Sequence, residues 1–457
     1  MMMSLLRSGF CVAGLLLSLA APALAITVKE VKSPGGITAY LAEDHTNPII
    51  AITFGFRGGS ALDPAAKLGL SSMTSALIDE GAGPLDSFAF QSALEDRAIR
   101  LGFSADRDMI RGNLVATTPN SAKAFELMQM ALTSPRFDAE PVERIRRQIL
   151  VGITSREENP GRIARKTLME AVLPNHPYAS EDEGTKETIA SITVDDMRAW
   201  VKRNFAQDRL LVSASGDITA AELGKTMDML FGHLPKTSGL DIRLPEAAVP
   251  AKGQTIRVEK NLPQSVVYMA QKGLKRQDPD WYIASVNDYI FGSGSFASRL
   301  MDEVREKRGL AYGVSTSLQP YDHAALMFAS VGTRADQADI SIGVIRDEWK
   351  KMRDAGPTQE ELDSAKQYLT GTWPLRFTST GSIAEILLAV QRDNLGIDFL
   401  DRRNSLIEAV TLVDAKRVAK TLYDPDGLTV VIVGPVPKPA AKTQPAKAQV
   451  PKPQPKP

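Results

Sequence analysis

Cysteine is almost missing from this chain of 457 residues, which contains a single one, Cys11. Cys11 lies in an apolar run near the N-terminus, and no lipid-attachment pattern surrounds it. One cysteine cannot close an internal disulfide, and a mature chain without this run would carry no thiol. The protein can therefore reside in an oxidising compartment without using disulfide chemistry.

An excess of either charge is also missing. The 54 Lys and Arg residues are balanced by 54 Asp and Glu residues. A chain without an overall basic field has no general attraction to nucleic acid, so we expect no nucleic-acid partner. Beyond the N-terminal run, no apolar stretch is long enough to cross a membrane.

Histidine is scarce as well. The chain has only four, at His45, His176, His233 and His323. No two of them are spaced to share one face of a helix, so we interpret each as a surface or loop residue rather than a metal ligand. A metal site of an unrecognised kind is an alternative that this spacing does not support.

The first 25 residues have the features of a secretion signal. Arg7 supplies the positive charge, an apolar run follows it, and the segment ends in small residues at Ala23 and Ala25. The run is short for a membrane span, although a retained N-terminal anchor is the alternative. We predict a cleaved signal peptide over residues 1–25 and a periplasmic location.

The last residues, 436–457, combine prolines and alanines with lysines and contain no acidic residue. Such a composition cannot bury a core and predicts an extended, disordered tail. We interpret it as a solubilising tail. Weak attraction to anionic cell-envelope polymers or to a partner is the alternative.

An internal repeat is the most informative feature of the chain. Residues 189–216 and 407–434 match without a gap, each as a helix followed by an aliphatic strand. Thr193 and Thr411 stand at equivalent positions before the two helices, where a threonine oxygen can accept hydrogen bonds from first-turn amides. The strand that ends each copy is rich in β-branched and aliphatic residues.

Earlier segments repeat more loosely. Residues 50–57 alternate as a half-buried strand, and residues 265–271 are their counterpart in the second half. An apolar helical face follows in each half, at 121–132 in the first and at 340–349 in the second.

These repeats predict an α+β protein with two homologous tandem domains, each a mainly antiparallel sheet packed with helices. Proline and glycine punctuation marks a linker at 238–255, which places the N-terminal domain at 26–237 and the C-terminal domain at 256–435. Two similar halves joined in this way suggest a clam-like arrangement with a binding cleft between them.

Several phrases of the sequence occur together in one known family. They are Phe54-Gly55-Phe56-Arg57-Gly58-Gly59-Ser60, Glu157-Glu158-Asn159-Pro160, Pro174-Asn175-His176-Pro177-Tyr178, Phe291-Gly292-Ser293-Gly294-Ser295-Phe296-Ala297-Ser298-Arg299-Leu300 and Val304-Arg305-Glu306-Lys307-Arg308-Gly309-Leu310-Ala311-Tyr312. With the duplicated layout, they resemble the insulinase-type (M16) zinc metallopeptidases and the mitochondrial processing peptidase, in particular the short secreted bacterial forms. The resemblance covers residues 26–434.

Active members of this family bind zinc through His-x-x-Glu-His on the first helix and a further Glu from a later helix, and the Glu between the histidines is the general base. The matching positions here are Ser72, Ser75, Ala76 and Gly152. Hydroxyls are poor zinc ligands, and alanine and glycine offer no side-chain donor. The resemblance therefore implies that this chain holds no metal and no other cofactor.

The degenerate segment is expected to be a structural helix that packs through Leu70, Met73 and Leu77 at helical spacing. Asp79 and Glu80 follow it, and we interpret them as solvated carboxylates of its last turn.

The second half keeps residues that the family uses around the scissile peptide. The resemblance assigns Arg305 and Tyr312 to a pair that holds substrate and stabilises charge at the carbonyl. From spacing alone, Arg305 would be a solvated helix residue and Tyr312 a half-buried strand residue. The family also binds substrate along an exposed strand edge. The matching strand residues here are Leu101, Gly102, Phe103 and Ser104.

A chain with the Arg/Tyr pair but no zinc site fits a peptidase whose roles are divided between two chains. The resemblance implies a non-zinc-binding subunit of a periplasmic heterodimeric metallopeptidase that acts on peptides. Zinc would then be held by a secreted M16-like partner with an intact motif. The alternative is a catalytically inactive peptide-binding or scaffold protein, with a homodimer as one form of it.

Overall fold

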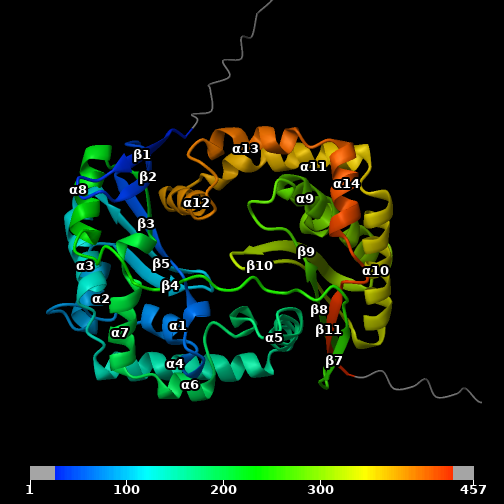
Figure 1. Cartoon of the computed structure of the whole chain (residues 1–457), viewed down its shortest axis with the longest axis horizontal. Helices are drawn as coiled ribbons and strands as arrows, with labels where there is room; N and C mark the ends of the chain where they lie inside the picture. The colour runs from blue at the N-terminus through cyan, green and yellow to red at the C-terminus, as the bar shows by residue number, and fades with distance from the viewer. Residues whose placement is uncertain (1–25, 436–457) are drawn as a thin grey trace, which may run out of the picture.

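Two mixed β-sheets organise the chain, one built from each half (Figure 1). The computed structural model describes residues 26–435, so the predicted signal peptide, 1–25, and the predicted tail, 436–457, lie outside the described residues. The strands of the first sheet are β1 (Val28–Lys32), β2 (Thr38–Glu43), β3 (Ile49–Arg57), β4 (Arg100–Ala105), β5 (Met109–Thr117) and β6 (Leu210–Gly216). The strands of the second are β7 (Thr255–Glu259), β8 (Gln264–Lys272), β9 (Ala311–Tyr321), β10 (Ala324–Arg334) and β11 (Thr429–Gly434).

The two sheets share one strand order, apart from an extra edge strand in the first. The orders are β1-β2-β6-β3-β5-β4 and β7-β11-β8-β10-β9. In each sheet the last strand of the half pairs in parallel with one neighbour, β6 with β2 and β11 with β7, and the remaining pairs are antiparallel. The predicted α+β fold with two similar, mainly antiparallel halves is confirmed, and β4 and β9 are equivalent outer strands.

Helices pack on both faces of the sheets (Figure 1). Those of the first half are α1 (Leu70–Ser75), α2 (Ser87–Glu95), α3 (Ser121–Thr133), α4 (Ala139–Glu158), α5 (Pro160–Val172), α6 (Lys186–Ser191), α7 (Val194–Asn204) and α8 (Ala220–Phe231). Those of the second are α9 (Trp281–Asp288), α10 (Ala338–Ala355), α11 (Gln359–Gly371), α12 (Thr380–Arg392), α13 (Phe399–Glu408) and α14 (Leu412–Leu422). Within residues 26–435, no helix combines the length and the apolar character that a membrane crossing requires.

The two copies of the repeat begin their helices in the same way. Thr193 accepts a hydrogen bond from the amide of Asp196 at 3.2 Å, and Thr411 accepts one from the amide of Asp414 at 3.1 Å. Both predicted helix caps are therefore confirmed. In α10, by contrast, Ile340 was expected on the buried face and is 52% exposed. It lies two residues before the buried Ile342, and two residues span more than half a helical turn, so the two side chains point to opposite sides of the helix.

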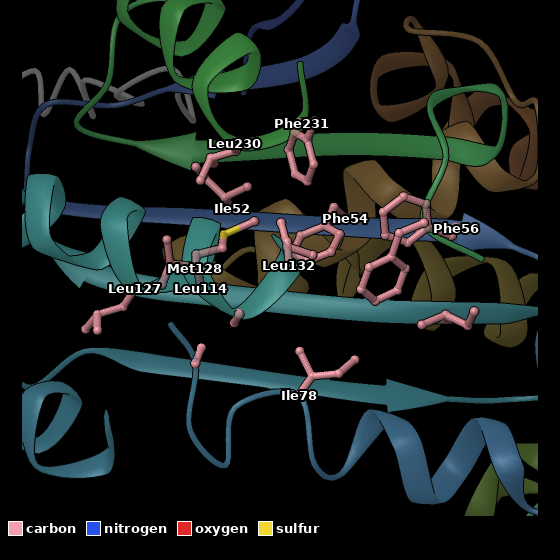
Figure 2. Close-up of a cluster of buried hydrophobic side chains, with 14 of the residues drawn as sticks. Ile52, Phe54, Phe56, Ile78, Leu114, Leu127, Met128, Leu132, Leu230 and Phe231 are labelled. Atoms are coloured by element: carbon pink, nitrogen blue, oxygen red, sulfur yellow. The ribbon is translucent and has the colours of Figure 1, made fainter. Parts of the chain in front are cut away.

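The core of the first half lies on one face of its sheet. Phe54 and Phe56 of β3 pack in this core with Ile52 and Leu114 (Figure 2). The ring of Phe54 lies 5.2 Å from that of Phe231. Burial of such large rings supplies much of the driving force for folding.

The second half has an equivalent aromatic core. Phe291 lies 4.9 Å from Trp349 and 4.8 Å from Tyr423, with the rings edge to face in both contacts. All three side chains are fully buried. Edge-to-face packing of this kind adds to the hydrophobic contribution of each ring.

Each half contributes one helix to the sheet of the other half (Figure 1). Helix α5 packs on β8 and β11 of the second sheet, where Leu168 is buried beside Val431. Helix α12 packs on β2, β3 and β6 of the first sheet, and the hydroxyl of Ser213 donates to the carbonyl of Ala384 at 2.7 Å. The two halves are therefore interlocked.

The turns of two hairpins meet between the halves. The Tyr178 hydroxyl donates a hydrogen bond to the carboxylate of Asp108, which lies in the β4–β5 turn. The same hydroxyl accepts a hydrogen bond of 3.1 Å from the amide of His323, which lies in the β9–β10 turn. The amide of Asp322 also donates to Asp108, at 3.2 Å. Burial raises the pKa of Asp108 to about 6. We call Asp108, Tyr178, Asp322 and His323 the hairpin junction.

Candidate functional site

The segment expected to be the zinc helix is a short one, α1, of six residues. The predicted contacts Leu70, Met73 and Leu77 are all buried. The helix nevertheless ends at Ser75, so Leu77 packs from a turn rather than from the helix.

Three of the degenerate zinc positions lie in or next to α1. The hydroxyl of Ser72 donates to the carbonyl of Asp182 at 2.7 Å, which holds a neighbouring loop. Ser75 is buried, and its hydroxyl has no hydrogen-bond partner among residues 26–435. Ala76 is exposed. These positions serve packing and loop attachment.

The fourth position, Gly152, lies on α4 beside a positive charge. A β-carbon at Gly152 would stand 3.4 Å from Nη1 of Arg156. Arg156 itself faces Glu183 at 3.5 Å. A guanidinium at this place opposes the binding of a cation. In the part of the chain that the structure describes, no group of three or more His, Cys, Asp and Glu side chains is placed to hold a metal ion.

The carboxylates after α1 are not solvated, so that prediction was wrong. Burial raises the pKa of Asp79 to about 6. Glu80 pairs with Arg144 at 2.6 Å and accepts a hydrogen bond from the hydroxyl of Ser87. Both side chains are withdrawn from solvent because the chain turns back against α2 and α4 after α1.

The four histidines are dispersed, as their spacing predicts. His45 is exposed and hydrogen-bonds Asp217 at 2.6 Å, which raises the pKa of His45. His233 is exposed. His176 lies in its predicted loop but is buried, and its Nε2 contacts the carbonyl of Pro245 at 2.9 Å.

Arg305 and Tyr312 lie together at the surface. Arg305 comes from the π-helical segment Met301–Glu306 and Tyr312 from the start of β9. The guanidinium carbon of Arg305 is 4.9 Å from the centre of the Tyr312 ring and 4.6 Å from that of Phe296. Tyr312 is 87% exposed, so the half-buried position expected from spacing alone was wrong. We call Phe296, Arg305 and Tyr312 the stacked triad.

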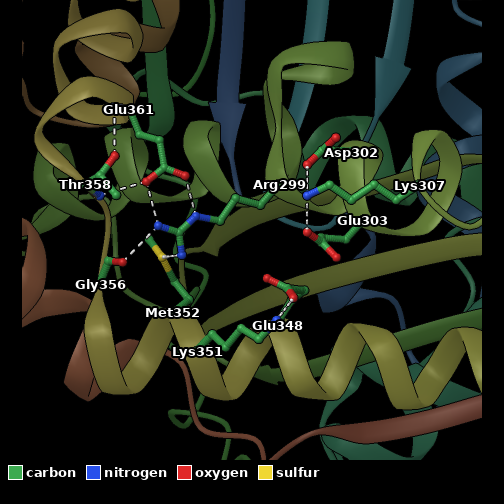
Figure 3. A network of polar contacts seen from close by, with 10 residues as sticks. All are labelled: Arg299, Asp302, Glu303, Lys307, Glu348, Lys351, Met352, Gly356, Thr358 and Glu361. Carbon is green, nitrogen blue, oxygen red and sulfur yellow. Dashed lines mark hydrogen bonds and ion pairs between the residues drawn. The ribbon is translucent and has the colours of Figure 1, made fainter.

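Ion pairs brace the segment that carries Arg305 (Figure 3). Arg299 binds both carboxylate oxygens of Glu361, at 2.5 and 2.6 Å, which ties the start of the segment to α11. Lys307 pairs with Asp302 at 2.7 Å and with Glu303 at 2.6 Å at its end. A two-point contact between arginine and a carboxylate is strong and directional. The backbone thus presents Arg305 from a fixed position.

A hollow of about 500 Å³ opens beside the stacked triad. Its walls include the triad, and its floor consists of small residues on two paired strands, namely Gly313, Ser315, Ser330 and Gly332. A β-carbon at either glycine would meet nothing within 4 Å. The glycine-floored hollow can therefore accept several side chains of a ligand.

The predicted substrate edge, Leu101, Gly102, Phe103 and Ser104, lies in β4. This strand is the last of its sheet and pairs only with β5. Phe103 anchors it, since its ring lies 6.0 Å from that of Phe54. The outer edge of β4 has no strand partner within the described residues. Its role in binding substrate stays a prediction.

Phe296 is the site residue that sequence reasoning missed. It was part of the glycine-rich phrase but was not singled out. It is 66% exposed, which is unusual for a ring of its size. A lone aromatic residue between serines and glycines, shortly before Arg305, was the available signal.

Comparison with known proteins agrees with this geometry. The family described as "Peptidase M16 inactive domain" matches residues 191–369. The "Non-peptidase homolog YmxG" of Helicobacter pylori is 26% identical over 412 residues, which cover 90% of this chain and 94% of that protein. The mitochondrial-processing peptidase subunit beta of Blastocladiella emersonii is 25% identical over 419 residues, 88% of each chain.

A solved structure is similar over nearly its whole length. The peptidase M16 inactive domain from Pseudomonas fluorescens matches with a TM-score of 0.85 at 28% identity, over 90% of this chain and 98% of that one. Sequence, fold and the substituted zinc positions thus agree. In sequence and fold the chain is thus similar to the M16 peptidases and their inactive relatives, and it lacks the inverted zinc motif.

Proposed function

We propose that this chain is the zinc-free subunit of a periplasmic, heterodimeric M16-type peptidase, and that it contributes Arg305 and Tyr312 to the cleavage of peptides. The observation that carries the proposal is the braced pair of a half-buried Arg305 and an exposed Tyr312, in a chain whose zinc positions offer no ligands. Relatives named as subunits of the mitochondrial-processing peptidase support a partner of the same family. The zinc and the general base would come from that partner.

The stacked triad suits the stabilisation of negative charge. Cation–π contacts with the rings of Phe296 and Tyr312 hold the Arg305 guanidinium in place, and its N–H groups can donate to a ligand. Nε faces Glu306 at 3.4 Å, so the terminal nitrogens are the donors for a ligand. The Tyr312 hydroxyl is a second donor. Donors fixed beside a scissile carbonyl stabilise the charge that develops on its oxygen.

The test is a pair of variants in the complex with a zinc-bearing M16 chain. We expect Arg305→Lys to lower kcat by about 100-fold, the usual loss of one charge-stabilising donor. Tyr312→Phe should lower kcat less, because one hydroxyl is removed and the ring that stacks on Arg305 remains. Complex formation, followed by size-exclusion chromatography, should be unchanged in both.

Arg308→Lys and Tyr368→Phe are matched controls. Arg308 is exposed and pairs with Glu303, and Tyr368 is exposed and stacks on Tyr289 at 5.0 Å. Both controls should turn over normally. Normal turnover by Arg305→Lys and Tyr312→Phe as well would show that the pair has no part in cleavage.

A catalytically inactive peptide-binding protein is the second candidate. The open glycine-floored hollow is the observation that favours it, together with zinc positions that offer no ligands. This candidate predicts that the chain binds peptide without a partner and that no mixture with a zinc-bearing M16 chain gains activity.

A further inference from the structure

The outer edge of β9 has no strand partner among residues 26–435. This strand is the last in its sheet, and its eleven residues, Ala311–Tyr321, include no charged side chain. Soluble proteins usually guard such edges with charges, prolines or bulges, because unpaired backbone groups attract another strand. The only proline here, Pro320, is the second-last residue. The first half of β9 therefore has no charge and no proline, and its one irregularity is the bulge at Tyr312, where the register with β10 shifts.

The glycine-floored hollow adjoins this same half of β9. Tyr312, Gly313 and Ser315 are all exposed. Because Gly313 pairs with Gly332 and Ser315 with Ser330, the sheet has almost no side-chain bulk at this end. A strand added beside β9 could thus place side chains in the hollow without displacing any from the protein.

The repeat gives this edge a counterpart. β9 occupies the same place in the second sheet as β4 in the first. The family resemblance assigns substrate to β4, whereas β9 has Arg305 and Tyr312 next to it. Of the two equivalent edges, β9 is thus the one that lies next to the Arg305–Tyr312 pair.

We propose that the edge of β9 binds an extended peptide as an added strand, with an acidic side chain of the peptide against Arg305 in the glycine-floored hollow. Added strands are held by backbone hydrogen bonds, and pockets for alternate side chains supply selectivity. The proposal deepens the proposed function and rests on it, since it identifies an acidic, extended segment as the preferred substrate.

A second copy of this chain fits the edge less well than a peptide. Pairing of β9 with β9 of another copy would bring no carboxylate to Arg305, because the strand has no acidic residue. A hollow of about 500 Å³ also matches a few side chains rather than a whole domain.

The test is binding of a synthetic peptide, Lys-Thr-Val-Thr-Glu-Thr-Val-Thr-Lys, to the mature chain without a partner, measured by isothermal titration calorimetry. In an added strand only every second amide faces the neighbouring strand. Two N-methylated forms of the peptide should therefore differ in their affinity for the chain. One form is methylated at the valines and the glutamate, and the other at the threonines. We expect one form to lose binding and the other to keep it. Equal behaviour of the two forms would overturn strand addition.

A pair of variants tests the location. Ser315→Glu places a negative charge in the hollow and should weaken binding about tenfold or more, by repulsion of the peptide glutamate. Thr255→Glu, on the exposed opposite edge strand β7, is the matched control and should bind normally. Hydrogen exchange should show new protection at residues 311–316 when peptide binds.

Protection at residues 100–105 instead, with normal binding by Ser315→Glu, would place the peptide on β4 and overturn the inference. Absence of binding by the unmodified chain would overturn it as well. Neither result would touch the proposed function, which the turnover of the Arg305 and Tyr312 variants decides separately.

Discussion

At the scale of single residues, buried polar side chains fix the segments around the site. Arg209 is almost fully buried at the start of β6. It donates to the carbonyls of Arg57 and Gly58, at 2.5 and 2.9 Å, and to the side chain of Asn204 at 3.0 Å. Burial lowers the pKa of Arg209 to about 10, so it remains charged at neutral pH. Arg209 thereby holds the end of β3, from which the chain leads to α1.

Replacement of Arg209 by methionine should lower the free energy of unfolding by about 3 kcal/mol, because two carbonyls and an amide oxygen would be left buried without partners. Urea unfolding monitored by circular dichroism measures the loss. Arg243→Met is the control, since Arg243 is exposed and pairs only with the nearby Asp241, and it should cost less than about 0.5 kcal/mol. Equal stability of the two variants would contradict this account of Arg209.

Residue-scale prediction from the sequence named candidates where a phrase of the family could be matched, and it failed where burial depends on tertiary packing. Arg305 and Tyr312 were singled out together, and the structure brings them together. The contact with Phe296 depends on the backbone of the glycine-rich stretch, where Ser295 has a positive φ of 51°. No spacing rule encodes that conformation.

At the scale of elements, the repeat predicted the strands and helix starts well, because local periodicity and capping act within a few residues. It did not predict that α5 and α12 pack on the opposite sheets. Amphipathic spacing shows that a helix has a buried face but not which sheet covers that face. The early end of α1 was also missed. The apolar spacing that predicted the helix continues to Leu77, whereas the helix ends at Ser75.

The crossing of α12 predicts cooperative unfolding. Leu387 is fully buried against Ala42 of β2, although the two belong to different halves. Leu387→Ala should cost about 2–5 kcal/mol through the cavity it leaves. Both sheets should still unfold in one transition, observed by urea titration with hydrogen exchange of each sheet.

The control is Leu375→Ala, because Leu375 is 68% exposed. A loss of stability confined to the second sheet, or two separate transitions, would show that the halves are not coupled through α12.

At the scale of the whole molecule, the hairpin junction connects the halves through a buried carboxyl group. The pKa of Asp108 is about 6, above its ordinary 3.8, chiefly because of burial. The folded state therefore favours the protonated form. The contribution of Asp108 to stability is full below about pH 4 and is lost as the pH rises through about 6.

Asp108→Asn should keep the contact with Tyr178 and remove this pH dependence. Urea midpoints of the variant should fall less than those of the unmodified chain between about pH 4 and pH 7. Burial also raises the pKa of Asp63, Asp79 and Asp288 to about 6, so part of the slope should persist. An identical slope in the variant and the unmodified chain would show that Asp108 does not titrate in this range.

The central proposal is that this chain completes a peptidase whose zinc is held by a partner. The most direct measurement is peptidase activity on an unstructured peptide, for this chain, for a secreted zinc-bearing M16 partner, and for the two mixed with zinc. We predict cleavage by the mixture at a rate well above that of either chain separately. A zinc-bearing chain that cleaves equally well without this one would contradict the assignment of Arg305 and Tyr312 to a shared active site.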